Sequence, residues 1–550
     1  MVRHVTLCVV LLVLLMPLGC GGDDKSSSTS SPSPGASAGG ASGGPSGGVT
    51  SANPGDNTAA GNPGYWLNKA IPLAKEANSP GVLGALAKAQ AKAKLFDDAV
   101  ASAGAIADPY EKADALCSAA KLQCEELKKE DALKTLADAT AAAGKVSDPA
   151  KKAAVLAFIA ETWKLLGKAD KAASAFRDAT AAAKEVESDK ARIDALCLVA
   201  EAGARAGYAR GASSMYASAV ETAKQLNSTE KYNAISNIAG SQAKAKMVDA
   251  AYDSAALIPA GSYNDACIQH IVEAQARSGE MQAAMKNTRD VITEPYKSYA
   301  LRTIAQCYAE GKSFDQAMNV AGKLKEGDSI RSSAFMAIAQ EQARADKIDD
   351  ALETMKQVTR NPDNARGLRG IAEEMIKAGK KSDALKVLTD AAEAAKKVED
   401  WEDMIRYMAD IGASQVKAGD SVAGAKTFED ALYFAGKTSD KLTKAKALRD
   451  VAWAQAEIND GKASIKTFTD SLAVLKEIGA RTEGPGGDRE VFVRSMASAL
   501  AREGKTAAIA DLIEALKDES AAIRAWCCVG AARGMIERQR PNEKIDWDNP

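Results

Sequence analysis

A recurring eight-residue pattern that usually ends in a small residue constrains this chain more than any other feature of its sequence. ADALCSAA at 113–120, IDALCLVA at 193–200 and SYALRTIA at 298–305 illustrate the pattern. Taking the last residue of each copy as an anchor gives thirteen copies, and self-similarity at such a period indicates a repeat architecture. The anchors are Ala87, Ala120, Ala160, Ala200, Ala239, Val272, Ala305, Ala339, Ala372, Gly412, Ala452, Ala497 and Gly530.

Each copy carries the apolar stripe of an amphipathic helix. Four residues before the anchor the side chain is always large and apolar, as at Leu116, Leu196 and Phe335, which is the i, i+4 spacing of one helix face. The commonest anchor spacings are 33 and 40 residues, and their difference of seven residues is about two helical turns. An insertion of that length keeps the stripe in phase, so we expect a longer second helix in some units.

Start and stop signals divide each unit into two helices. Asp108-Pro109 and Asp148-Pro149 each place a capping residue before a Pro in the first helical turn. Gly167 and Gly207 lie seven residues after their anchors, where the first helix is expected to end. The sequence therefore predicts an all-α fold, an α–α superhelical solenoid of about thirteen helix–turn–helix repeats over residues 65–540. Because neighbouring repeats stack, we expect an elongated array with a concave and a convex face.

The repeat register resembles that of the tetratricopeptide repeat family over about residues 65–540. In the copy IAETWKLLGKADKAASAFRDA, the family's small, aromatic, Gly, Ala, aromatic and Ala positions are matched by Ala160, Trp163, Gly167, Ala172, Phe176 and Ala179. The resemblance implies a solenoid that binds a protein or peptide partner in its concave groove.

The chain departs from this family three residues after the anchor, where the family usually has an aromatic residue. Seven copies carry Gln there, and two explanations of this Gln are open. The amides could be buried and hydrogen-bond between stacked hairpins, since a buried amide must be satisfied, or they could form a polar strip that lines the groove. Seven copies carry this residue: Gln90, Gln123, Gln242, Gln275, Gln342, Gln415 and Gln455.

A series of arginines supplies the candidate groove residues. Arg302, Arg369, Arg449 and Arg494 each lie three residues before an anchor, a register that faces the concave side in the family that the chain resembles. Trp453 follows its anchor directly and is expected to lie close to Arg449. Guanidinium groups there could hold ligand carboxylates bidentately. The alternative is that the arginine stems lie along the surface and their head groups pair with acids.

The N-terminal residues predict export and lipidation. Residues 1–19 combine a positive start with a short apolar run that is too short to span a membrane. Leu18-Gly19-Cys20 resembles the lipobox of bacterial lipoproteins, although Pro17 replaces the usual aliphatic residue. The resemblance implies a lipid on Cys20 and a place in the cell envelope facing the periplasm or exterior, with outer-membrane sorting favoured in a two-membrane bacterium. A plain secretory signal is the alternative.

Composition separates the remaining segments from the repeats. Residues 20–64 are rich in Gly, Ser and Pro and have too few apolar side chains to bury a core, which predicts a disordered tether. Residues 541–550 form a C-terminal tail beyond the last repeat.

Several classes of chemistry are disfavoured by the sequence. A formal net charge of -2 argues against a nucleic-acid partner. Only His4 and His270 occur, and the nine cysteines match no zinc spacing. Gly-Lys-Ser and Gly-Lys-Thr triplets lack the upstream Gly of a phosphate-binding loop. We therefore expect no metal, no cofactor, no nucleotide and no catalytic residues, and we expect most cysteines to be small buried side chains.

Together these features predict a lipid-anchored scaffold that binds a partner protein or peptide at the cell envelope. The alternative is an envelope enzyme or enzyme accessory, for instance in peptidoglycan turnover. A clustered acid in the groove with a strongly raised pKa would favour that alternative. A structural spacer would instead show a groove without consistent charge or exposed aromatic residues.

Overall fold

The computed structural model describes residues 60–547, except 459, 479–486 and 542. The predicted signal peptide, Cys20 and most of the predicted tether lie outside the described residues. Within that part of the chain there are 26 α-helices, one short 3-10 helix and no strand. No described helix is long and apolar enough to cross a membrane.

Thirteen helices carry the repeat anchors, and every anchor is buried. These even-numbered helices form the inner layer. They are α2 (Pro80–Lys92), α4 (Pro109–Glu125), α6 (Pro149–Leu165), α8 (Asp189–Arg205), α10 (Ser228–Lys244), α12 (Ser262–Arg277), α14 (Tyr296–Glu310), α16 (Ser329–Arg344), α18 (Asn361–Lys377), α20 (Trp401–Ala418), α22 (Lys441–Glu457), α24 (Asp488–Arg502) and α26 (Ala521–Gln539).

The odd-numbered helices form the outer layer, and each one from α3 onward packs against the even-numbered helix before it. They are α1 (Pro63–Ala77), α3 (Phe96–Gly104), α5 (Lys129–Ala143), α7 (Ala169–Lys184), α9 (Ala209–Ala223), α11 (Val248–Ala255), α13 (Met281–Asn287), α15 (Phe314–Ala321), α17 (Ile348–Met355), α19 (Lys381–Ala395), α21 (Ser421–Lys437), α23 (Gly461–Ile478) and α25 (Thr506–Ala515). The 3-10 helix, Thr288–Asp290, directly follows α13. The predicted all-α solenoid of about thirteen repeats is confirmed.

The lengths of the outer helices follow the anchor spacings. The outer helices between anchors 39 to 45 residues apart are α5, α7, α9, α19, α21 and α23, and they have 15 to 18 residues. Those between anchors 33 or 34 residues apart are α3, α11, α13, α15, α17 and α25, with 7 to 10 residues. The extra two turns therefore lengthen the second helix, as the spacing predicts.

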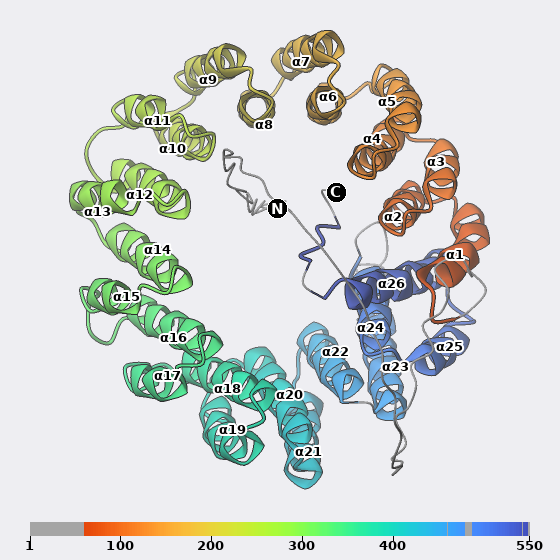
Figure 1. Cartoon of the computed structure of the whole chain (residues 1–550), viewed down its shortest axis with the longest axis vertical. Helices are drawn as coiled ribbons and strands as arrows, with labels where there is room; N and C mark the ends of the chain where they lie inside the picture. The colour runs from red at the N-terminus through yellow and green to blue at the C-terminus, as the bar shows by residue number, and fades with distance from the viewer. Residues whose placement is uncertain (1–59, 459, 479–486, 542, 548–550) are drawn as a thin grey trace, which may run out of the picture. The chain divides into compact units, whose positions relative to one another are not determined.

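Contacts within the two layers show how the array curves. Every consecutive pair of inner helices from α2 to α26 packs together, whereas among neighbouring outer helices only α23 and α25 make more than marginal contact in the described residues. The layer whose helices lie closer together is on the inside of the curve. The exposed side of the even-numbered helices is therefore the concave face, and we call it the inner face (Figure 1).

The two ends of the array pack against each other, where the sequence leads us to expect an open, elongated array. The described residues after the last inner helix, α26, form no second helix, and α1 packs against α26 as an outer helix packs within a hairpin (Figure 1). The buried residues of α1 have the same spacing as those of a second helix. Trp66, Leu67, Ala70 and Ala74 correspond to Thr135, Leu136, Ala139 and Ala143 of α5.

A continuous core crosses this contact between chain ends, which we call the seam. Buried side chains of α1 and of α26 belong to the same hydrophobic cluster. At its edges Arg540 Nη2 donates to the Lys92 carbonyl oxygen at 2.9 Å, and Arg524 lies 3.6 Å from Glu76. The thirteenth hairpin is thus assembled from the last and the first helix of the array, which leaves no end repeat with an uncovered apolar face.

Candidate interaction face

Polar side chains bridge consecutive helices along the inner face. Arg205 on α8 lies 2.7 Å from Glu161 on α6, and it also approaches Glu201 on its own helix. Ser241 on α10 donates a hydrogen bond of 2.6 Å to Glu201. Burial raises the pKa of Glu161, and the Arg205 guanidinium opposes that shift. These bridges connect neighbouring hairpins at positions that remain partly open to solvent.

The densest cluster of charges lies on α18 and α20. Arg369 Nη1 is 3.1 Å from Glu373 Oε1 and 3.4 Å from Asp410 Oδ2, and Ser414 Oγ donates to the same Glu373 oxygen at 3.3 Å. Desolvation raises the pKa of Asp410 to about 6, against the opposing charge of Arg369, and the nearby carboxylates of Glu373, Glu457 and Asp450 raise it further.

Next to this cluster, α22 presents an arginine between two aromatic rings. The guanidinium carbon of Arg449 lies 4.4 Å from the ring centroid of Phe492 and 5.4 Å from that of Trp453. Its Nη2 is 2.7 Å from Asp450 Oδ1. The buried indole N–H of Trp453 has no hydrogen-bond partner among the described residues. The predicted neighbours Arg449 and Trp453 therefore do lie together.

The other two predicted arginines lie apart from that pair. Arg302 lies over Tyr299 with its guanidinium carbon 5.5 Å from the ring centroid, and Arg494 lies over Trp526 at 4.9 Å. Arg369 and Arg449 both have carboxylate partners, as the alternative explanation of this series expects. The four arginines thus occupy one repeat register on four inner helices without forming a single cluster.

The repeat glutamines are buried within hairpins, with exposed fractions of 0–6%. Three of them accept a hydrogen bond from the residue twelve positions later, on the outer helix of the same hairpin. Ser254 Oγ donates to Gln242 Oε1 at 2.8 Å, and Thr427 Oγ1 does the same to Gln415; the third pair is Asn287 with Gln275. The bonds run inside one hairpin and not between stacked hairpins, and the amides do not line the inner face.

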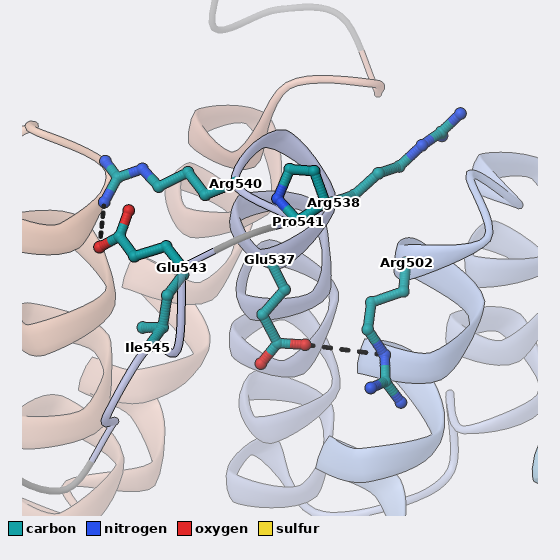
Figure 2. A pocket seen from close by; sticks show the side chains of 7 residues that line it. All are labelled: Arg502, Glu537, Arg538, Arg540, Pro541, Glu543 and Ile545. Atoms are coloured by element: carbon teal, nitrogen blue, oxygen red, sulfur yellow. Dashed lines mark ion pairs between the residues drawn. The ribbon is translucent and has the colours of Figure 1, made fainter. Parts of the chain in front are cut away.

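A pocket of about 470 Å³ lies near the seam, where α24 and α26 end (Figure 2). Glu537 points toward Arg502, at 3.6 Å, and Glu543 lies 3.5 Å from Arg540. The C-terminal segment itself forms one wall, with Pro541, Glu543 and Ile545. No sequence pattern marks this pocket, because its residues come together only when the segment after α26 folds back.

The remaining candidate residues do not form a reactive site. Cys117, Cys267, Cys527 and Cys528 are buried free thiols, and desolvation raises the pKa of the last to about 12. Burial lowers the pKa of His270. In the part of the chain that the structure describes, no three His, Cys, Asp or Glu residues are grouped so as to hold a metal ion.

No protein-family model matches this sequence, and a search of curated proteins finds no match. A search of solved structures finds several matches at low identity. Ton1535 from Thermococcus onnurineus NA1 is 18% identical with a TM-score of 0.28, covering 66% of this chain and 96% of that one. The pentatricopeptide repeat protein PPR10 from maize is 13% identical with a TM-score of 0.29, covering 80% and 73%. Cut9–Hcn1 of the APC/C is 12% identical with a TM-score of 0.23, covering 82% and 90%.

The hairpins and contacts described above define the class of this protein. It is an all-α solenoid of stacked helix–turn–helix repeats, as the two-layer hairpins themselves show.

Proposed function

We propose that this chain is a lipid-anchored scaffold of the bacterial cell envelope that binds a partner protein or peptide on its inner face. The observation that carries the proposal is the partly exposed Arg369–Asp410 ion pair on α18 and α20, with Arg449 and Trp453 beside it on α22. Partly exposed arginine and tryptophan are the residue types that dominate binding energy in protein interfaces. The charges of both signs suit a polar peptide better than a polyanion.

The placement at the envelope is supported by the sequence of residues 1–20. If Cys20 carries the lipid, Cys20→Ser should move the protein from the membrane fraction to the soluble exported fraction of the producing bacterium. Metabolic labelling with a fatty acid should label the unaltered chain and leave the variant unlabelled. A label that persists in Cys20→Ser would refute lipidation at this residue.

Binding is tested by affinity purification from detergent-solubilised membranes, followed by mass spectrometry. Arg369→Ala combined with Arg449→Ala should deplete the specific partner at least about tenfold, because two paired interface charges are worth several kcal/mol. Lys377→Ala changes an exposed basic residue of the same helix, α18, and should retain the partner. Equal recovery with all three proteins would overturn the proposal.

The alternative of an envelope enzyme has one observation in its favour, the raised pKa of Asp410. A general acid needs both such a shift and a place for substrate beside it. Asp410 is ion-paired to Arg369, and the pocket on α24 and α26 is formed by other residues. Hydrolysis of peptidoglycan by the purified chain that Asp410→Asn abolishes would support the enzyme in place of the scaffold.

A further inference from the structure

The segment after α26 folds back over the seam and places Trp547 on side chains from both ends of the chain. The guanidinium carbon of Arg533 on α26 lies 4.8 Å from the Trp547 ring centroid, and Lys92 Nζ on α2 lies 5.9 Å from it. The indole N–H donates to Glu537 Oε1 at 2.7 Å. The segment therefore occupies a surface that neither end of the array forms alone.

The two basic side chains of this surface are deeply covered. Lys92 is 8% exposed and Arg533 is 7% exposed. Burial lowers the pKa of Lys92, and the negative charges of Glu125 and Asp546 act against that shift. A covered cation is costly unless it is compensated. An aromatic face and a neighbouring carboxylate provide such compensation, and the Asp546-Trp547 pair offers both.

The contacts of the segment after α26 are those of a ligand that can dissociate from the seam. Closure of the array does not depend on Trp547, because α1 covers α26 and Arg540 already joins α26 to α2. Glu543 and Asp546 are exposed. Pro541, Glu543 and Ile545 of the segment also line the pocket of about 470 Å³.

We propose that Lys92, Arg533 and Glu537 form a peptide site for an acidic residue followed by tryptophan. The chain's own C-terminal segment is the resident occupant, and a partner peptide of the same chemistry competes with it. This inference rests on the proposed function, since it names the chemistry of a partner of the scaffold. A tethered occupant is present at an effective concentration in the millimolar range, so a partner must displace it before it binds.

The test uses the full chain and a fluorescein-labelled synthetic peptide with the sequence of residues 541–550. Fluorescence anisotropy measures binding of this peptide to the unaltered chain and to Trp547→Ala. Removing the resident Trp frees the site, so the peptide should bind the variant at least about tenfold more tightly. Trp547→Leu, which keeps an apolar side chain against the core, should behave in the same way if Trp547→Ala folds poorly by circular dichroism.

The site residues are tested in the Trp547→Ala background. Lys92→Met keeps the apolar stem and removes the charge, and it should weaken peptide binding about tenfold or more. Lys377→Ala, at the same register of a distant inner helix, is the matched control and should leave binding unchanged. A labelled peptide with Ala in place of its Trp should not bind.

Equal affinity of the peptide for the unaltered chain and for both Trp547 variants would overturn the proposal, and so would the absence of binding to the variants. Either result would leave the scaffold function standing, because that function is measured by partner recovery with the Arg369 and Arg449 variants. Loss of partner recovery with the Arg369 and Arg449 variants bears on the scaffold function alone, because those two residues lie on α18 and α22 and not at the seam.

Discussion

Ser254 on α11 donates a hydrogen bond of 2.8 Å to the buried amide oxygen of Gln242 on α10, twelve residues earlier. In the other repeats too, the residue types at these two positions, twelve residues apart, correspond in polarity. Each of the seven buried glutamines is followed twelve residues later by a polar side chain: Ser102, Thr135, Ser254, Asn287, Thr354, Thr427 or Thr467. The five complete repeats without Gln pair apolar or small residues instead: Trp163–Ala175, Gly203–Met215, Tyr308–Val320, Met375–Val387 and Leu500–Leu512. The two helices of a hairpin are therefore matched in polarity at this point.

This matching predicts the effect of breaking one pair. Thr427→Val removes the donor to Gln415 and leaves a buried amide oxygen unsatisfied, which should cost about 1–3 kcal/mol. Combining it with Gln415→Met recreates the apolar pair that the next hairpin toward the N-terminus already has, and should recover most of the loss. Urea denaturation of the two single variants and the double variant measures the coupling as a double-mutant cycle. Additive losses would show that the two residues do not form a unit.

The amide pairs also show how far sequence reasoning extends. The anchors, the helix boundaries and the longer second helices follow from patterns within one repeat, and the structure has them as predicted. The polar residue twelve positions after each glutamine stands in the sequence, but only the structure shows that this spacing crosses the hairpin and that Gln242, Gln275 and Gln415 accept a hydrogen bond there.

The seam does not follow from the order of the repeats, because it joins α26 to α1, and α1 carries no repeat anchor. The spacing of Trp66, Leu67, Ala70 and Ala74 matches that of a second helix, but only the structure shows that α1 completes the hairpin of α26. The pairing of Arg369 with Asp410 depends on side-chain conformations and on the approach of α18 to α20, which the sequence does not specify.

A charged side chain in the seam should destabilise α1 and α26 together. Ala70 is fully buried between α1 and α26, and Ala70→Asp should destabilise this contact by more than about 3 kcal/mol because it buries an unpaired carboxylate. Hydrogen exchange followed by mass spectrometry should show faster exchange in α1 and in α26, and little change in α12 or α14. Asn68→Asp, on the exposed side of α1, is the control. Faster exchange in α1 alone would contradict the composite hairpin.

Lowering the pH should stabilise the unaltered chain more than the variant Asp410→Asn, which lacks the titrating acid of the inner face. The pKa of Asp410 is raised to about 6 in the folded chain, above its ordinary value of 3.8, so folding favours the protonated acid. Its contribution to stability is present at low pH and is lost as the pH rises through about 6. The melting temperature of Asp410→Asn relative to that of the unaltered chain should therefore be higher at pH 7–8 than at pH 4. Asp390→Asn, at an exposed site on α19, should show no such trend. A melting-temperature difference between Asp410→Asn and the unaltered chain that does not depend on pH would refute the raised pKa of Asp410.

The contact of α24 with α26 should tolerate no side chain at Gly530. A Cβ atom there would meet the backbone carbonyl of Arg494, and one at Gly534, a turn later, would meet that of Ser498. Because backbone atoms cannot move aside as a flexible side chain can, Gly530→Ala should destabilise the chain by about 1–3 kcal/mol despite the higher helix propensity of Ala. Gly436→Ala in α21, where a Cβ meets nothing within 4 Å, should instead stabilise it by about 0.5–1 kcal/mol. Thermal unfolding of both variants measures the difference, and a gain in stability for Gly530→Ala would show that these two helices do not approach as closely as the structure has them.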